Sequence, residues 1–351
     1  MEATNFWNNH TLNNFQILAK LKYVHSSEIS SVCFLKDGRI ASSSRDKSVL
    51  IYNKITFKIE IRIKERKDIF YMNVNKDGIL ITCMNGTYLN LYEFKGKRYS
   101  NIQTIRPYNL KINIIGIFDN TYYIKKYIEL KNGDIAILDR GFLVSFYKKN
   151  KKSKKFSYLN QYNEDEENLD SISDIYELDD NQYCLNSATK IKFLDWNKKI
   201  ITNTIEFGEA LYSSFPCDEL LLMDKKDLLV FRLSTIYIID IQKKEIIKKI
   251  NIYVSGYFSC IYKVSDNIVI AGFWNNCIGQ LEYDKNTKNL KLISNIGKKR
   301  VPNSGINEVS SISFKNNIFV FPYNNNFNGS SLIIYQLKNK YYSNIKFEKK
   351  I

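Results

Sequence analysis

The chain has 351 residues and a formal net charge of +16 at pH 7, with only two histidines. A histidine-based catalytic triad or a histidine-rich metal site therefore has almost no material in this sequence. The positive excess is compatible with nucleic acid, an anionic membrane or an acidic partner as the ligand. Lysines dispersed over strand edges and loops explain it too, and we favour that explanation.

Composition favours a β-rich, intracellular protein. Aromatic residues make up 14% of the chain, and its 25 tyrosines and 21 phenylalanines are good strand formers. The six cysteines form no C-x-x-C pair and most lie in apolar strand patterns, which indicates buried free thiols in a reducing compartment. No secretory leader and no apolar run of about 18 residues is present. We therefore expect a cytoplasmic protein and leave a nuclear location open.

At the start of the chain, residues 1–14 form a tail and residues 15–24 are predicted to be a strand. This strand is expected to pair with the last repeat and so to fasten the two ends of the chain together. The sequence leaves open whether it replaces or supplements an outer strand near Tyr342–Phe347.

The stretch from His25 to Asn53 contains three short alternating apolar runs. Turn signals at Lys36–Gly38 and Ser44–Lys47 separate them, which predicts a meander of antiparallel strands with two-residue hairpin turns. The pattern returns about every 40 to 55 residues, the period of one propeller blade, and a charged fourth run follows in most units. The sequence therefore predicts an all-β, seven-bladed β-propeller with four antiparallel strands per blade, while six or eight blades stay open. The approximate blades are residues 25–65, 66–106, 107–161, 162–206, 207–251, 252–297 and 298–351.

The first unit resembles a repeat of the WD40 family. His25 falls at the family's histidine, Ser42 at its strand serine and Asp46 in its tight turn, while Tyr52 stands where the family has tryptophan. The resemblance implies that these four residues form a buried structural hydrogen-bond relay, and it leaves open whether the Tyr52 hydroxyl takes part. The other units match only in hydrophobic pattern and turn chemistry, so the chain is identified as a divergent member.

A lysine-rich segment at Lys148–Lys155 joins two strands of the third unit, and an acidic segment at Glu164–Glu167 follows one strand later. In WD40 geometry the lysine segment lies on the bottom rim, where it would offer a contact for phosphate or an acidic protein. Two solvated loops drawn together by opposite charge are the alternative that we favour. The candidate basic rim comprises Lys148, Lys149, Lys151, Lys152, Lys154 and Lys155.

Three long links, at residues 107–120, 206–216 and 298–308, join consecutive units on the expected top face. Long loops on a rigid scaffold often carry binding residues, and aromatic and arginine side chains suit anchors. Packing within the loops explains the same residues equally well. The candidate partner-binding residues are Arg106, Tyr108, Phe118, Tyr212, Phe215, Lys298, Lys299 and Arg300.

No nucleophile-elbow, P-loop or dinucleotide-binding motif is present in the sequence. We therefore expect no catalytic residue, no metal, no cofactor and no small-molecule substrate. The favoured function is a non-enzymatic scaffold or complex subunit that binds protein or peptide partners on the top face and rim of the propeller. The alternatives are an RNA- or DNA-associated component and, more weakly, an adaptor for anionic membranes.

Overall fold

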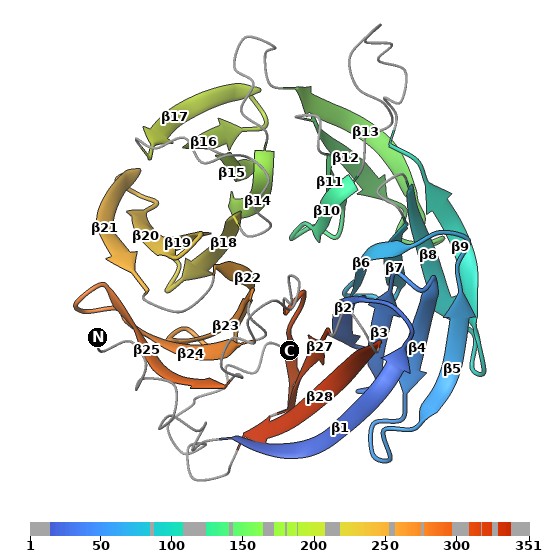
Figure 1. Cartoon of the computed structure of the whole chain (residues 1–351). Helices are drawn as coiled ribbons and strands as arrows, with labels where there is room; N and C mark the ends of the chain where they lie inside the picture. The colour runs from blue at the N-terminus through green and yellow to red at the C-terminus, as the bar shows by residue number, and fades with distance from the viewer. Residues whose placement is uncertain are drawn as a thin grey trace, which may run out of the picture. The chain divides into compact units, whose positions relative to one another are not determined.

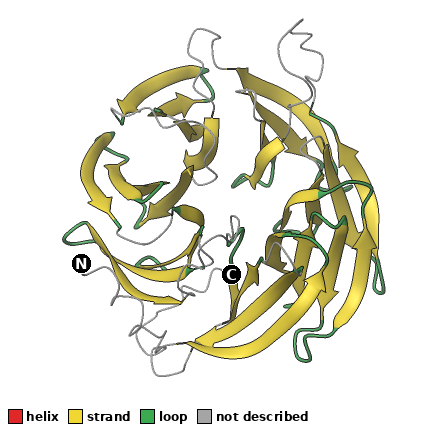
Figure 2. Cartoon of the chain, in the orientation of Figure 1, coloured by secondary structure: helices red, strands yellow, loops and turns green. Residues whose placement is uncertain are grey.

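Every element of regular structure in the described part of the chain is a β-strand. The computed structural model describes residues 15–84, 88–107, 124–139, 143–163, 172–179, 181–187, 189–207, 218–252, 257–274, 277–296, 309–316, 318–324 and 329–337. The 28 strands in these ranges form seven four-stranded sheets (Figures 1 and 2). The expected fold class, a seven-bladed β-propeller with four antiparallel strands per blade, is confirmed.

Six of the sheets use four strands that are consecutive in the chain. The first three contain β2 (Ile29–Phe34), β3 (Ile40–Ser44), β4 (Ser48–Tyr52) and β5 (Ile59–Lys64); β6 (Ile69–Val74), β7 (Leu80–Met84), β8 (Tyr88–Phe94) and β9 (Tyr99–Ile105); β10 (Ile124–Glu129), β11 (Ile135–Asp139), β12 (Leu143–Lys149) and β13 (Phe156–Asn163). The next three contain β14 (Ile172–Asp179), β15 (Gln182–Ser187), β16 (Lys190–Asp195) and β17 (Ile200–Glu206); β18 (Asp218–Met223), β19 (Asp227–Arg232), β20 (Thr235–Asp240) and β21 (Glu245–Asn251); β22 (Phe258–Lys263), β23 (Ile268–Phe273), β24 (Ile278–Asp284) and β25 (Asn289–Ile296).

The seventh sheet combines both ends of the chain. Its order is β1–β28–β27–β26, where β1 spans Phe15–His25 and the C-terminal strands are β26 (Ser313–Lys315), β27 (Ile318–Tyr323) and β28 (Ser330–Leu337). In Figure 1 the blue β1 runs beside the red β28, and the two pair antiparallel. The stretch Tyr342–Phe347 lies outside the described residues, so a further outer strand there stays a prediction.

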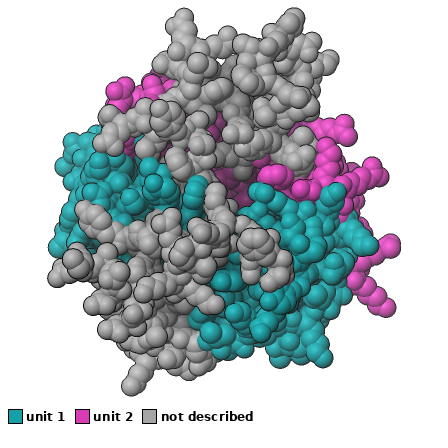
Figure 3. Space-filling view, viewed as in Figure 1, with its two compact units in different colours: residues 1–64, 221–351 teal, residues 65–220 magenta. Residues whose placement is uncertain are grey.

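The chain divides into two compact units, residues 65–220 and residues 1–64 together with 221–351 (Figure 3). In each unit the second and third strands of a sheet supply most of the core. β3, β4, β7 and β19, for example, are buried at every position, because these strands have neighbours on both sides. The core residues are mainly isoleucine, leucine, valine and phenylalanine, which pack well on a pleated surface.

The hairpin turns between first and second strands are one residue longer than expected in the first three blades, whereas the pairs Asp179–Gln182 and Lys315–Ile318 leave the expected two-residue turns in the fourth and seventh blades. In the first blade the Leu35 N–H donates to the Arg39 carbonyl at 2.8 Å, and the Gly38 N–H donates to the Leu35 carbonyl at 3.0 Å. This is a three-residue loop, in which a type I turn is followed by a residue in the left-handed region. Gly38 has φ 89°, and Gly78 and Gly133 in the next two blades have φ 83° and 88°. Glycine fixes the loop because it adopts these angles without strain.

The outer strands carry one extra residue each. In six blades the pairing of third and fourth strands shifts register, for example between Phe146 and Tyr147 of β12, where Leu159 of β13 is the extra residue. A β-bulge bends an edge strand and interrupts its row of backbone hydrogen-bonding groups. The outer edges are therefore poor templates for pairing with another chain.

Candidate functional site

The structure brings His25, Ser42, Asp46 and Tyr52 together in the first blade. The two ring nitrogens of His25 lie 2.9 Å from Asp46 Oδ2 and 2.7 Å from Ser42 Oγ. Ser42 Oγ lies 3.0 Å from the Tyr52 hydroxyl, so the tyrosine takes part in the network. Burial raises the pKa of Asp46, but hydrogen bonds from His25 and Ser48 outweigh it and hold that pKa below its usual range. Because both His25 nitrogens are engaged and its side chain is buried, the network suits a structural role.

A second network of the same layout occupies the second blade, with Glu65 in place of the histidine. Glu65 Oε1 accepts hydrogen bonds from Thr82 Oγ1 at 2.9 Å and from the Tyr92 hydroxyl at 2.7 Å. Burial and the adjacent Glu65 carboxylate raise the pKa of Tyr92 above its ordinary value. This network was not predicted from the sequence, because the WD40 pattern has a histidine where this blade has Glu65. The spacing was a usable signal, since Glu65 precedes Thr82 and Tyr92 by 17 and 27 residues, as His25 precedes Ser42 and Tyr52 in the first blade, although there the Tyr52 hydroxyl bonds Ser42 and not His25.

A charged cluster forms where the innermost strands of consecutive blades lie side by side. Tyr71, Lys126 and Asp174 each follow a register shift near the start of their strand. Lys126 Nζ lies 2.9 Å from Asp174 Oδ1, and the Leu220 N–H donates to Asp174 Oδ2 at 2.9 Å. Burial lowers the pKa of Lys126, but Asp174 and Glu219 outweigh it and hold that pKa above its ordinary value. Lys126 therefore stays protonated and is unsuited to act as a nucleophile or base.

A repeated turn between third and fourth strands accounts for part of the lysine excess. The side-chain oxygen at the first position of the turn accepts hydrogen bonds from backbone N–H groups two or three residues later. The residue four positions after the first has a positive φ. Two lysines at that later position reach a carboxylate of the preceding blade: Lys154 Nζ lies 2.6 Å from Glu93 Oε1, and Lys288 Nζ lies 2.6 Å from Asp227 Oδ2. The first positions are Asn53, Asn150, Asp195, Asp240 and Asp284, and the positive-φ residues are Phe57, Lys154, Lys199, Lys244 and Lys288.

The candidate basic rim separates into two kinds of lysine. Lys149 pairs with Asp77 of the preceding blade, and Lys154 pairs with Glu93 as described above. The ammonium groups of Lys154 and Lys95 lower the pKa of Glu93 to about 2. The remaining four are exposed and make no ion pair with any described residue: Lys148, Lys151, Lys152 and Lys155.

Only Arg106 of the candidate partner-binding residues is described, and it is exposed just after β9. The others lie outside the described residues, namely Tyr108, Phe118, Tyr212, Phe215, Lys298, Lys299 and Arg300. The acidic segment Glu164–Glu167 lies outside them too. The assignment of the long links as partner contacts therefore stays a prediction.

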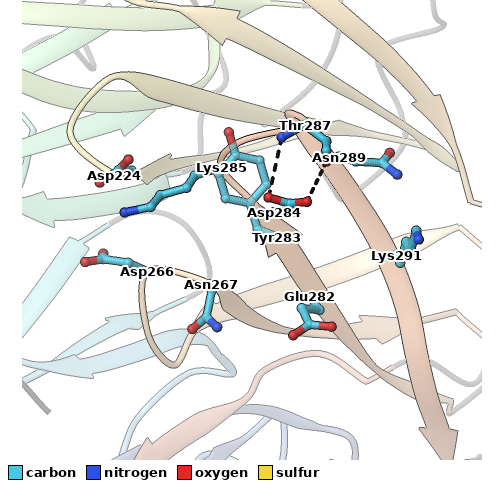
Figure 4. A pocket seen from close by; sticks show the side chains of 10 residues that line it. All are labelled: Asp224, Asp266, Asn267, Glu282, Tyr283, Asp284, Lys285, Thr287, Asn289 and Lys291. Carbon is cyan, nitrogen blue, oxygen red and sulfur yellow. Dashed lines mark hydrogen bonds between the residues drawn. The ribbon is translucent and has the colours of Figure 1, made fainter. Parts of the chain in front are cut away.

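An open pocket of about 720 Å³ lies between turns of the fifth and sixth blades (Figure 4). Its lining is polar and includes four carboxylates and two lysines, but several of these groups are already engaged. Asp284 accepts hydrogen bonds from the hydroxyl and the backbone N–H of Thr287, and Asp266 lies 2.7 Å from Lys263 Nζ. The pocket thus presents turn-capping side chains rather than a convergent catalytic group. The lining residues are Asp224, Asp266, Asn267, Glu282, Tyr283, Asp284, Lys285, Thr287, Asn289 and Lys291.

Five of the six cysteines are described, and all five are buried and free. Burial raises the pKa of Cys33 and of Cys277 to about 12, which keeps both as unreactive thiols. Within the described ranges, no group of three or more histidine, cysteine, aspartate or glutamate side chains is arranged to hold a metal ion. The same ranges contain no helix with the length and apolarity that a membrane span requires.

Comparison with known proteins shows the fold. No family model matches the chain, and no curated protein matches it by sequence. Among solved structures, the chain is similar to the WD40 β-propeller domain of Doa1 (TM-score 0.67, 13% identity, covering 93% of this chain and 99% of that one). It is also similar to the WD40 repeats of RRP9 (TM-score 0.68, 12% identity, covering 94% of this chain and 99% of that one). The third similar structure is U3-55K (TM-score 0.68, 11% identity, covering 93% of this chain and 100% of that one). The WD40-type propeller expected from the resemblance is confirmed as the fold.

Proposed function

We propose that this chain is a non-enzymatic scaffold that docks protein partners on the rim and loops of its propeller. The observation that carries the proposal is that titratable groups with shifted pKa values are engaged in structural hydrogen bonds and ion pairs. Asp46 and Lys126 both lie in hydrogen-bonded networks that join strands or blades. Groups engaged in such networks stabilise the fold and are not available for proton transfer or nucleophilic attack.

A rigid frame with exposed charge at its turns is suited to presenting contacts to another macromolecule. The lysines of the rim divide into those that join blades and those that face solvent, and the second kind is available to a partner. The fold is common to many functions, so the proposal rests on these side chains and not on the similarity to other propellers. The intracellular location expected from the sequence is part of the proposal.

Affinity purification of the tagged full-length chain from its native cells, with nuclease and in moderate salt, tests this function. A stoichiometric set of proteins that survives nuclease treatment is expected. Partners that disappear with nuclease, together with recovered RNA or DNA, would replace the scaffold by the nucleic-acid component. Binding to vesicles only when acidic lipid is present would instead support the membrane adaptor.

A further inference from the structure

We propose that the β8–β9 and β12–β13 hairpins together form one basic docking surface for an acidic segment of a partner protein. This inference rests on the scaffold function proposed above and assigns one of its contact sites. The surface, called here the twin-hairpin surface, is defined by Lys97, Arg98, Lys148, Lys151, Lys152 and Lys155, all of which are exposed.

The tip of the β12–β13 hairpin has a defined shape. Asn150 Oδ1 accepts hydrogen bonds from the Lys152 and Ser153 N–H groups, each at 3.0 Å. The Lys154 N–H donates to the Asn150 carbonyl at 2.8 Å, and Lys154 has φ 57°. The lysines on this turn are therefore presented by an ordered backbone, which lowers the entropy that binding must overcome.

The two hairpins are fastened to each other. Lys154 of the third blade lies 2.6 Å from Glu93 of the second blade, and Glu93 also pairs with Lys95. Beside this contact, Gln103 of β9 donates to the Phe156 carbonyl at 2.6 Å and accepts from its N–H at 2.7 Å. These bonds bring the two hairpin tips next to each other, so their charges act as one surface.

The charges of the surface are unbalanced. Of the nearby carboxylates, Glu93 pairs with Lys154 and Lys95, Asp77 pairs with Lys149, and Asp134 accepts hydrogen bonds from the Lys149 N–H and the Asn132 amide. The six cations of the twin-hairpin surface make no ion pair with any described residue. Lys97 and Arg98, and Lys151 and Lys152, are consecutive in the chain, and charges within about one Debye length, roughly 8 Å at physiological salt, act together on one anionic ligand.

In the sequence, the chain's own acidic segment comes after β13. Lys155 precedes β13 and Glu164 follows it, so the eight-residue strand Phe156–Asn163 separates them. At about 3.3 Å per residue this strand is roughly 25 Å long. An acidic segment supplied by another protein reaches the lysines without that constraint.

One observation favours a protein segment over single-stranded nucleic acid. Leu159, the bulged residue of β13, is 51% exposed. Apolar surface next to the cations suits a peptide that mixes acidic and apolar side chains. Tyr158, beside the lysines, forms a T-shaped pair with Tyr147 at 5.7 Å and is 37% exposed, so it offers a face to a base as well as to a peptide and does not discriminate between them.

The test compares two full-length variants that each lose four positive charges. The hairpin variant carries Lys148→Gln, Lys151→Gln, Lys152→Gln and Lys155→Gln. The matched control carries the same change at exposed lysines of the first and fifth blades whose side chains make no hydrogen bond or ion pair with any described residue: Lys54, Lys58, Lys225 and Lys226. Equal denaturant midpoints for both variants and the wild type establish that the substitutions leave the fold intact.

Fluorescence anisotropy at physiological salt measures binding of a labelled peptide with four consecutive glutamates flanked by leucines, and of a labelled 12-nucleotide oligouridylate. We expect the hairpin variant to bind the peptide about tenfold more weakly and the control to change by less than about twofold. Equal loss in both variants would reduce the effect to net charge and overturn the inference. Tighter binding of the oligouridylate than of the peptide, lost only in the hairpin variant, would assign the surface to nucleic acid.

Affinity purification of the same variants separates failure of this inference from failure of the scaffold function. Loss of a protein partner from the hairpin variant, but not from the control, supports the inference. Retention of every partner by the hairpin variant would overturn it and leave the scaffold function standing. A wild-type chain that recovers no protein partner would overturn the scaffold function itself.

Discussion

The ion pair between Lys126 and Asp174 makes a sharp prediction about stability. Replacing Lys126 by methionine keeps most of the apolar stem and removes the ammonium group. The Asp174 side chain, which is 2% exposed, then loses its cation while remaining buried. It keeps backbone hydrogen bonds from Ile175 at 2.8 Å and Leu220 at 2.9 Å.

Removing one partner of a buried ion pair costs about 3–5 kcal/mol, because the other charge is left without compensation. The Lys126 side chain is 26% exposed and Asp174 retains two donors, so we expect the lower end of that range, about 3 kcal/mol. Asp174→Asn keeps an acceptor for the backbone and removes only the charge, so about 1.5–3 kcal/mol is expected.

Equilibrium urea denaturation, followed by tryptophan fluorescence and circular dichroism, measures both variants and the double variant. Trp196 reports on the same compact unit, because its ring packs 4.0 Å from that of Phe146. The double variant is expected to lose less unfolding free energy than the two single variants lose together, by at least about 1 kcal/mol. A loss below about 1 kcal/mol for Lys126→Met, or additivity within about 0.5 kcal/mol, would refute the reasoning.

Three further changes test other features. Glu65→Leu is expected to cost about 1–3 kcal/mol in urea denaturation and Glu65→Gln less, because only leucine leaves the buried Thr82 and Tyr92 hydroxyls without an acceptor. Asp46→Asn is expected to lower stability by about 1–2 kcal/mol at pH 7. Since the native pKa of Asp46 is depressed from 3.8, its contribution is full above about pH 4 and is lost as the pH falls through the native value, so the difference between Asp46→Asn and wild type should shrink below pH 4. Gly329→Ala is expected to lower the melting temperature, because Gly329 has φ 79° and an added Cβ would lie 2.5 Å from the His25 carbonyl oxygen.

Each of these expectations has an outcome that contradicts it. Equal losses for the two Glu65 variants would show that the carboxylate is not needed as an acceptor. A constant difference between Asp46→Asn and wild type from pH 7 to pH 3 would contradict the depressed pKa. An unchanged melting temperature for Gly329→Ala would mean that the β1–β28 junction relaxes to accept the methyl group.

Local patterns predicted the fold well, because turn residues and the alternation of apolar and polar residues occur within each repeat. The Lys36–Gly38 turn and the Ser44–Lys47 turn identify one blade, and their recurrence identifies the others. The hydrogen-bond network of the second blade was not predicted, because a carboxylate occupies the position that an imidazole has in the first blade. Glu65 accepts hydrogen bonds from Thr82 and Tyr92, which stand at the same spacing as Ser42 and Tyr52 do from His25, so only the spacing preserves the signal.

Contacts between blades could not be predicted in this way. Lys126 and Asp174 meet because a register shift at the start of each inner strand places both side chains at equivalent points. A bulge has no sequence signature in a single chain. The division of the rim lysines also depends on a neighbouring blade, since Lys154 is paired only because Glu93 lies opposite it.

The pairing of β1 with β28 sets an order for events on the ribosome. Phe15 of β1 pairs with Leu337 of β28, which is 322 positions later in the chain. At about 5–20 residues per second, roughly 15–60 s of translation separate the two. During that interval β1, with Ile17 60% exposed even in the finished sheet, lacks its partner strand while the intervening blades are synthesised. The nascent chain thus carries β1 without its partner strand until β28 has been synthesised.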